Sequence, residues 1–194
     1  MRKRSMLVVT LSLCSLIIVS FLVRGNALAL QTTPGTAKTP VARGEYLVSS
    51  GGCHDCHTPK TFTQQGPVPD MSKSLSGAPA DIKLPAVPPG LISPTGWGAL
   101  ATNDLTAWVG PWGTSFAANI TSDKTTGMGS WTEAAFIKTM RTGKHKGALR
   151  DVLPPMPWES LGKLTDDDLK AIFAYLQSVK PIQNKVPDPI PPKR

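Results

Sequence analysis

One short segment of the sequence contains residues of the types that attach a cofactor covalently. Cys53-His54-Asp55-Cys56-His57 holds two thiols three positions apart, and an imidazole follows at once. The spacing C-x-x-C-H lets both thiols add to the two vinyl groups of one haem while the next residue turns its imidazole onto the iron. We therefore predict one covalent haem c, with Cys53 and Cys56 as thioether anchors and His57 as the proximal iron ligand. His54 is a variable position and is expected to face solvent.

Three other chemistries use parts of this segment. Two cysteines in an oxidising compartment suggest a disulfide. A thioredoxin-type C-x-x-C belongs near a βαβ pattern, and no run of β-branched residues flanks residues 53–57. A zinc site needs four ligands, and only His145 is left to join the thiols and histidines of the motif. The motif and its context favour covalent haem over each of these.

The iron needs a second axial ligand, and we expect it to be Met156. This residue lies in Leu153-Pro154-Pro155-Met156-Pro157-Trp158, where three prolines stiffen an extended loop. Thioether sulfur binds iron weakly, and a loop that is already stiff loses less entropy when it holds such a ligand. The alternative is a proline-rich hinge with an incidental methionine.

Other side chains could take the distal position, namely His145, Met71, Met128 and Met140. Met140 falls on the apolar face of an expected helix, where a methionine packs in the core. Met71 and Met128 fall in segments that we expect to be mobile or exposed. His145 lies in a basic turn flanked by glycines and is expected to be exposed, although a bis-histidine site is the fallback.

Helix signals place the motif directly after a first helix. Thr39 is a suitable N-cap with Pro40 at the first helical position, and Gly51-Gly52 ends the segment. We therefore predict a helix over about residues 40–50.

Two further helices are expected towards the C-terminus. One opens at Ser130, which forms a capping box with Glu133, and stops at Gly143. The other runs from the acidic turn after Thr165 to Lys180-Pro181, with apolar residues on one face. No stretch alternates convincingly as a strand. We therefore predict an all-α fold with three main helices and much loop.

The N-terminal residues have the composition of an export signal. Arg2-Lys3-Arg4 precedes an apolar run over residues 6–23, and Ala27-Leu28-Ala29 follows as a cleavage site. The run, which includes Cys14, is longer than a usual signal core, so an uncleaved anchor is the alternative to a cleaved signal peptide over residues 1–29. Either interpretation predicts export to the periplasm.

The net charge of +8 comes partly from this segment. Four of the 21 lysine and arginine residues precede residue 30, where no acidic residue occurs, which leaves 17 basic against 13 acidic residues. No cluster of basic residues with interleaved aromatics remains, so we exclude a nucleic-acid partner. The composition also excludes a wholly disordered chain, a long coiled coil and a polytopic membrane protein.

We expect four parts after the signal: a linker over 30–39, a haem domain over 40–180, an insertion over 60–115 within it, and a proline-rich tail over 181–194. The insertion holds eight prolines and three of the five tryptophans without a helical or alternating pattern. A loop of this length either shields the haem, by packing its tryptophans against the haem periphery or the helices, or offers a docking surface. The tail is expected to be an extended strap or a disordered end.

The sequence resembles exported mono-haem c-type cytochromes of class I, and it is also similar to the haem domains in the cytochrome subunits of bacterial membrane-bound alcohol and sugar dehydrogenases. The residues that carry the resemblance are Gly44-Glu45-Tyr46-Leu47, Gly52 to Pro59, Asn119-Ile120-Thr121, Pro155-Met156-Pro157-Trp158 and the helix from Leu164 to Leu176. The resemblance implies a class I cytochrome c fold, with three helices around the haem. It also implies that Gly44 lets Phe173 or Tyr175 of the last helix approach closely. Only one C-x-x-C-H is present, against several in the dehydrogenase subunits.

These ligands predict an electron carrier rather than an enzyme. An iron with histidine and methionine on its two faces has no open position, which leaves one-electron transfer as its chemistry. The expected partners are redox proteins, such as a dehydrogenase, another cytochrome or an oxidase, with membrane contact only if the N-terminal segment stays attached. One alternative is an electron-transfer subunit of a membrane-associated dehydrogenase complex. The other is a haem enzyme or sensor with an open iron.

Overall fold

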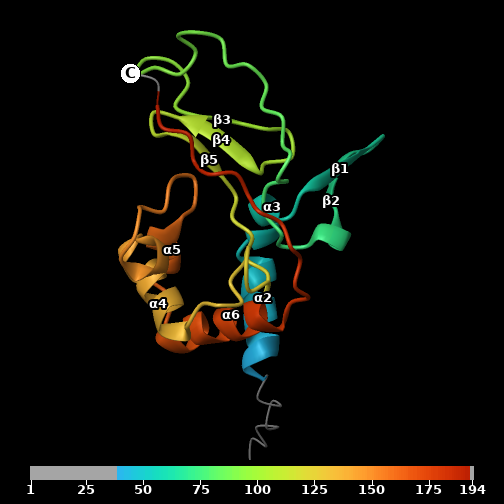
Figure 1. The fold of residues 1–194 in the computed structure, drawn as a ribbon, viewed down its shortest axis with the longest axis vertical. Helices are drawn as coiled ribbons and strands as arrows, with labels where there is room; N and C mark the ends of the chain where they lie inside the picture. Colours follow the sequence, from blue (N-terminus) through green and yellow to red (C-terminus); the bar gives the residue numbers. More distant parts are fainter. Residues whose placement is uncertain (1–38, 193–194) are drawn as a thin grey trace, which may run out of the picture. The chain divides into compact units, whose positions relative to one another are not determined.

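The computed structural model describes residues 39–192 (Figure 1). Its helices are α2 (Pro40–Ser50), α3 (Cys53–His57), α4 (Glu133–Thr142), α5 (Trp158–Leu161) and α6 (Asp166–Ser178), with 3₁₀ turns η1 (Met71–Lys73) and η2 (His145–Gly147). Its strands are β1 (Lys60–Thr63), β2 (Gly66–Pro69), β3 (Leu100–Ala101), β4 (Ala107–Gly110) and β5 (Gly113–Phe116). Over residues 39–192 no helix combines the length and the apolar character needed to cross a membrane.

The first and last of the expected helices are confirmed. α2 begins after Thr39, whose hydroxyl accepts a hydrogen bond from the amide of Ala42 at 3.2 Å, and ends at Gly51. α6 begins after Thr165, whose hydroxyl accepts from the amide of Asp168 at 3.1 Å. Each side-chain oxygen satisfies one of the backbone amides that the first turn leaves without a partner.

The helix between them starts later than predicted. The N-cap of α4 is Thr132, whose hydroxyl accepts from the amide of Ala135 at 3.1 Å, so the capping box from Ser130 is wrong. The hydroxyls of serine and threonine can both accept the capping hydrogen bond, and the sequence offers both residues. The predicted end is confirmed at Gly143, which takes a left-handed φ of 65°.

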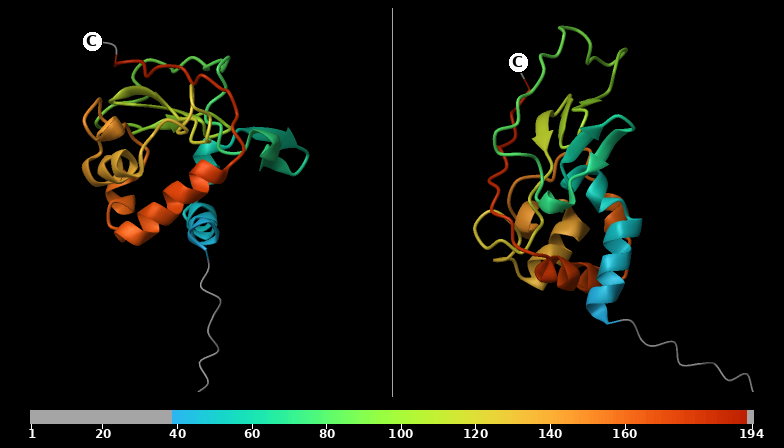
Figure 2. Two further views of the ribbon diagram at one scale, coloured as in Figure 1. Left: turned by 60° about the horizontal axis from the view of Figure 1, so that its bottom comes forward. Right: turned by 90° about the vertical axis from the view of Figure 1, so that its right-hand side faces the viewer.

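α2 and α6 cross in direct contact, as Figures 1 and 2 show. Gly44 lies at the crossing, where a Cβ would collide with the carbonyl oxygen of Ala171 and would lie 2.7 Å from the Cβ of Tyr175. Of the two aromatics expected beside this glycine, Tyr175 is therefore the neighbour. The buried apolar cluster next to the crossing comprises Val48, Leu75, Met128, Phe136, Met140, Leu169, Ile172, Phe173 and Leu176.

The prediction of an all-α fold is wrong, because parts of the insertion form two antiparallel sheets. β1 pairs with β2 in a hairpin, and β3, β4 and β5 form a second sheet in that order. The hairpin projects from the rest of residues 39–192 in Figure 1 and in the left view of Figure 2. The insertion also reaches the core, since Leu75 is fully buried there.

The strands are short, and their buried residues do not alternate with exposed ones, which explains why the sequence does not reveal these sheets. β1 and β2 are four residues each and nearly every residue in them is exposed, so neither face requires apolar side chains. A tight turn at Pro111-Trp112 joins β4 to β5. Gly113 makes this turn possible, because its φ is 94°. Alternation shows in a sequence only when one face of a strand is buried and the strand is long enough.

The C-terminal segment is an extended strap over the part of the tail that the structure describes. Ile190 and Thr114 exchange two backbone hydrogen bonds, of 2.7 and 3.0 Å, which adds the strap to the edge of β5. Asn184 donates through Nδ2 to the carbonyl oxygens of Ser76 and Ala78 at 2.7 and 2.8 Å. The strap, red in Figure 1, thus fastens the insertion to the helical part.

Candidate functional site

The C-x-x-C-H motif forms one helical turn, α3. Gly52 precedes the turn with a left-handed φ of 68°, a conformation that glycine adopts without strain. A single turn brings the thiols of Cys53 and Cys56 and the imidazole of His57 onto one short element. Both thiols are free and half-buried.

Backbone groups of the insertion and of the loop after it hold both the imidazole and the carbonyl group of His57. Its imidazole is 8% exposed, and Nδ1 donates to the carbonyl oxygen of Ala118 at 2.7 Å. Its own carbonyl oxygen accepts from the amide of Gly77 at 2.8 Å. The Nδ1 bond fixes the tautomer, so Nε2 carries the lone pair that a metal ligand needs.

Burial lowers the pKa of His57, although its hydrogen bond to Ala118 acts in the opposite direction. The imidazole is therefore neutral at pH 7. Neutral imidazole is the form that binds a transition metal.

Gly77 allows the loop at Ala117-Ala118 to reach His57. Its φ is 78°, and a Cβ there would collide with the carbonyl oxygens of Ala117 and Ala118. The amide of Ala78 donates to Ala117 at 2.8 Å across the same contact. Only glycine at position 77 lets the acceptor of the His57 proton lie where it does.

The thiols do not have the character of a thioredoxin-type pair. Burial raises the pKa of the Cys53 thiol to about 11 and also raises that of Cys56. Reactive redox cysteines have a lowered pKa, because the thiolate is the attacking species. No run of β-branched residues flanks the motif, and the strand β1 that begins at Lys60 forms an antiparallel hairpin and not a βαβ unit.

His54 is half-buried and does not simply face solvent. Its Nδ1 shares a hydrogen bond of 3.0 Å with the hydroxyl of Thr58, which is fully buried. The same hydroxyl accepts from the amide of Leu75 at 3.0 Å. Burial lowers the pKa of His54. The side chain therefore helps to connect the motif to the insertion.

Met156 and Cys53 lie against the same apolar core. Both are half-buried and pack on the cluster defined above. The loop that carries Met156 is tied to the second sheet, because the hydroxyl of Ser115 donates to the carbonyl oxygen of Pro154 at 2.5 Å. Its far end leads into α5, where Trp158 lies directly against Gly143.

The other methionines are distributed partly as expected. Met140 is 7% exposed and belongs to the core, as predicted. Met71 is 63% exposed in η1, also as predicted. Met128 is 5% exposed, so the expectation of a mobile or exposed position is wrong. It packs in the buried apolar cluster, while its amide donates to Thr121 at 2.8 Å and the side chain of Gln177 donates to its carbonyl oxygen.

His145 is half-buried in η2 and not fully exposed. Its ring meets the edge of Trp131, with 5.0 Å between the ring centroids. Burial, together with the charges of Arg150 and Lys146, lowers its pKa.

These residues fit a haem c. The motif turn offers two free thiols and a neutral, oriented imidazole, and a thioether lies against the same core as Cys53. Nitrogen and sulfur ligands of this kind are those that hold haem iron in electron-transfer proteins.

Sequence reasoning missed the groups that support the motif. The acceptor for His57 is a backbone carbonyl, which carries no residue signature. Lys60, whose ammonium lies at the end of the motif turn, was missed as well. The nearest sequence signal was its position three residues after the motif histidine.

Comparison with known proteins identifies several relatives, although no family model matches the chain. The cytochrome c subunit of a quinone alcohol dehydrogenase from Gluconobacter oxydans is 41% identical over 81 residues, 40% of this chain and 17% of that protein. The gluconate 2-dehydrogenase cytochrome c subunit of Pantoea cypripedii is 33% identical over 144 residues, 73% of this chain and 24% of that protein. The fructose dehydrogenase cytochrome subunit of Gluconobacter japonicus is 30% identical over 160 residues, 81% of this chain and 25% of that protein.

The chain spans between 10% and 28% of the length of the curated relatives that it matches. The resemblance to cytochrome subunits of bacterial dehydrogenases, which the motifs indicated, is confirmed by these relatives. The chain therefore contains a cytochrome c domain similar to those of the cytochrome c subunits of bacterial alcohol, gluconate and fructose dehydrogenases.

Proposed function

We propose that the chain is an exported mono-haem c-type cytochrome that carries single electrons between redox partners. The observation that carries the proposal is the motif turn, where a buried neutral His57 with Nε2 available lies beside two free thiols. Cys53 and Cys56 would hold the haem through thioether bonds, His57 would be its proximal ligand and Met156 its distal ligand. The haem would supply one-electron chemistry between ferrous and ferric iron.

The residues of the chain have three tasks in this function. The Ala118 carbonyl orients His57 and increases the basicity of its Nε2. The apolar cluster beside Cys53 and Met156 excludes water, which favours the less charged ferrous state. The Ser115 tie to Pro154 restrains the loop of Met156. With His57 and Met156 both holding the iron, substrates would have no access to the metal.

A second candidate function is an electron-transfer subunit of a dehydrogenase complex. It is favoured because the relatives are named as subunits of alcohol and gluconate dehydrogenases. The electron chemistry is the same, but a catalytic subunit would be a stable partner. Co-purification of the exported chain with an oxidoreductase supports this assignment, and a monomer that exchanges electrons with free partners supports the carrier.

Export belongs to the proposal as well. The signal or anchor predicted over residues 1–29 lies outside the residues that the structure describes. The N-terminal residue of the protein recovered from the periplasm distinguishes cleavage from anchoring.

The test of the proposal is the optical spectrum of the protein produced in a host that matures c-type haem. We expect a low-spin c-type spectrum, a weak sulfur-to-iron band when oxidised, and no response to carbon monoxide when reduced. The intact mass should exceed that of the polypeptide by one haem, and the haem should stay bound in acidified butanone. A Cys53→Ser/Cys56→Ser double variant, which can form neither thioether, is the control for the covalent bond.

Two results would contradict the proposal. A protein without haem overturns it entirely. A high-spin spectrum with ready binding of carbon monoxide keeps the haem but supports an enzyme or sensor with an open iron.

A further inference from the structure

Lys60 is a half-buried cation at the C-terminal end of the motif turn. Its Nζ donates to the backbone carbonyl oxygens of Asp55 at 2.6 Å and Thr58 at 2.8 Å. Longer contacts reach the carbonyl oxygens of His54 at 3.4 Å and Asp104 at 3.3 Å. Three of these four acceptors belong to the motif turn or to the residue that ends it.

This arrangement meets a specific need of α3. The last carbonyl groups of any helix lack partners within the helix, and a five-residue helix has few internal hydrogen bonds to begin with. A cation at this end also interacts favourably with the helix dipole. The ammonium of Lys60 therefore closes the turn on which the two thiols and His57 are carried.

The charge of Lys60 is not neutralised locally. Among the described residues, no carboxylate lies within 4.0 Å of its Nζ. The carboxylate of Asp104 is occupied elsewhere, since it accepts from the hydroxyls of Thr102 at 2.6 Å and Thr106 at 2.8 Å. Asp104 thus presents only its backbone oxygen to Lys60 and links the loop between β3 and β4 to the motif turn.

We propose that Lys60 is a positioning residue that closes the motif turn and whose uncompensated charge raises the reduction potential of the haem. The proposal rests on the haem site proposed above. A fixed positive charge near the site disfavours the additional positive charge of ferric iron, and partial burial protects this effect from screening by salt. Lys60 also makes the potential depend on the insertion, through Asp104.

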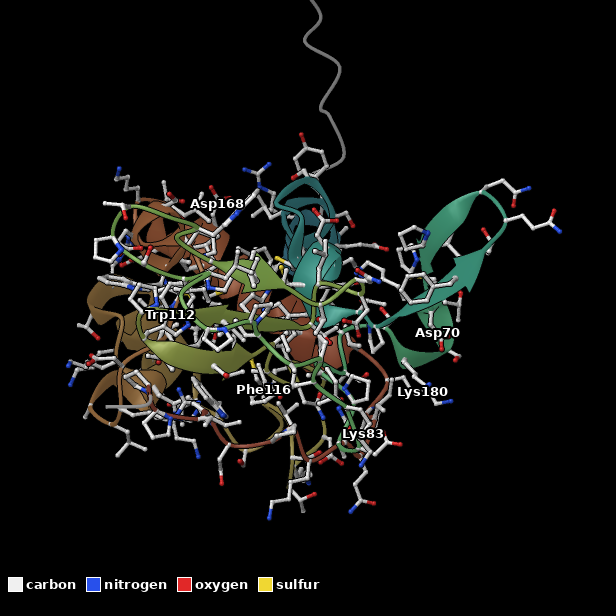
Figure 3. The ribbon with its side chains drawn as sticks, turned by 90° about the horizontal axis from the view of Figure 1, so that it is seen from above. Asp70, Lys83, Trp112, Phe116, Asp168 and Lys180 are labelled. Carbon is white, nitrogen blue, oxygen red and sulfur yellow. The ribbon has the colours of Figure 1, made fainter. Side chains whose placement is uncertain are left out.

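The test compares reduction potentials of haem-loaded variants by spectroelectrochemical titration. Lys60→Gln keeps hydrogen-bond donors and loses the charge, Lys60→Met loses both, and Lys60→Arg keeps the charge. Lys83→Gln is the matched control, because Lys83 is exposed on the insertion, as Figure 3 shows, and makes no interaction within the described residues. Covalent haem content is measured by pyridine haemochrome for every variant.

We expect Lys60→Gln and Lys60→Met to shift the ferric-to-ferrous ratio at fixed potential towards ferric by between about two- and tenfold, the upper value corresponding to about 59 mV. Lys60→Arg should remain near the wild type, and Lys83→Gln should not shift. Should both neutral variants fail to retain haem while Lys60→Arg and Lys83→Gln retain it, the closing role of the charge is supported.

Either of two outcomes overturns the proposal. One is a Lys60→Gln protein with the potential of the wild type. The other is a Lys83→Gln protein that shifts as far as Lys60→Gln. A wild-type protein that binds no haem is a different failure, because it removes the proposed function and not only the role of Lys60.

Discussion

Met156 is the side chain on which the chemistry of the proposed haem depends most directly. It is half-buried against the core, in a loop that Ser115 restrains. Replacing Met156 with alanine should open the distal position, so that the reduced protein binds carbon monoxide. The potential should fall by roughly 0.1 V or more, since axial ligands set haem potentials over a range of about 0.8 V.

Carbon monoxide difference spectra and a redox titration check this prediction. Met71→Ala is the control, because Met71 is 63% exposed and should leave both properties unchanged. If Met156→Ala keeps the wild-type spectrum and potential, the methionine is not the ligand, and His145 becomes the next candidate.

Asp123 is a second residue with a measurable role, in acid stability. Its carboxylate accepts hydrogen bonds from the amides of Thr125 and Thr126 at 3.1 and 2.7 Å, and from both hydroxyls. The pKa of Asp123 is lowered to about 2, and the largest contributions come from the hydrogen bonds donated by the amide and the hydroxyl of Thr126. The folded state therefore favours the charged form of Asp123. The charged carboxylate stabilises the folded state above about pH 4, and this stabilisation is lost as the pH falls towards 2.

The free energy of unfolding of wild type and Asp123→Asn, measured between pH 2 and 5, tests this role. The variant should show a shallower loss of stability on acidification. Asp81→Asn removes one exposed carboxylate as a matched change. Equal slopes for wild type and Asp123→Asn would exclude the carboxylate as a cause of the acid sensitivity.

At the scale of the elements, the close contact between α2 and α6 depends on Gly44. A Cβ at this position collides with the Ala171 carbonyl, and backbone at a crossing cannot move aside without separating the helices. Gly44→Ala should lower the free energy of unfolding by roughly 1–3 kcal/mol or more, the range for overpacked sites. Chemical denaturation measures the loss.

Gly98→Ala is the matched control for this substitution. A Cβ at Gly98 meets nothing within 4 Å, so its stability should be close to that of the wild type. A Gly44→Ala protein as stable as Gly98→Ala would mean that the helices do not cross as closely as described.

The side chain of Asn184 fastens the strap to the insertion. Asn184 donates to Ser76 and Ala78 and accepts from the amide of Ala80 at 3.1 Å. Asn184→Ala leaves these backbone groups without their partner, which costs about 1–3 kcal/mol. Hydrogen exchange should also quicken at the Ala80 amide.

Asn103→Ala serves as the control, since Asn103 is exposed and makes no hydrogen bond in the described part of the chain. Unchanged stability and exchange in Asn184→Ala would show that the other hydrogen bonds of the strap, to β5 and to Asn119, Thr121 and Thr126, are enough to hold it.

The helices were predictable from the sequence because their ends are marked by local chemistry. Thr39 and Thr165 cap as expected, and Gly143 ends α4 as expected. The motif predicts haem chemistry at Cys53 and His57 on its own, and those roles stay a prediction. Each of these signals lies within a few residues of the feature that it specifies.

The sheets and the supports of the site were not predictable in the same way. β1 and β2 are exposed on both faces, so no alternation marks them. The acceptor for His57 is a carbonyl 61 residues away, and any residue provides a carbonyl. Lys60 is unremarkable in sequence, and its role follows only from where the motif turn ends.

At the scale of the whole molecule, the small second sheet connects several separate segments. In Figure 3, Trp112 and Phe116 mark the region of β4 and β5. The loop between β3 and β4 reaches Lys60, the hydroxyl of Ser115 reaches Pro154, and the backbone of Thr114 pairs with the strap. The motif turn and the loop of Met156 are thus tied to the same sheet.

This shared attachment bears on the speed of electron exchange. When a site gains or loses an electron, its nuclei must first move towards the geometry of the other oxidation state, and the energy of that movement sets much of the barrier. Because one sheet restrains both sides of the proposed site, the ligands have little room to shift. We therefore expect a small reorganisation energy, and hence rapid self-exchange of electrons, from a segment whose sequence shows no regular pattern.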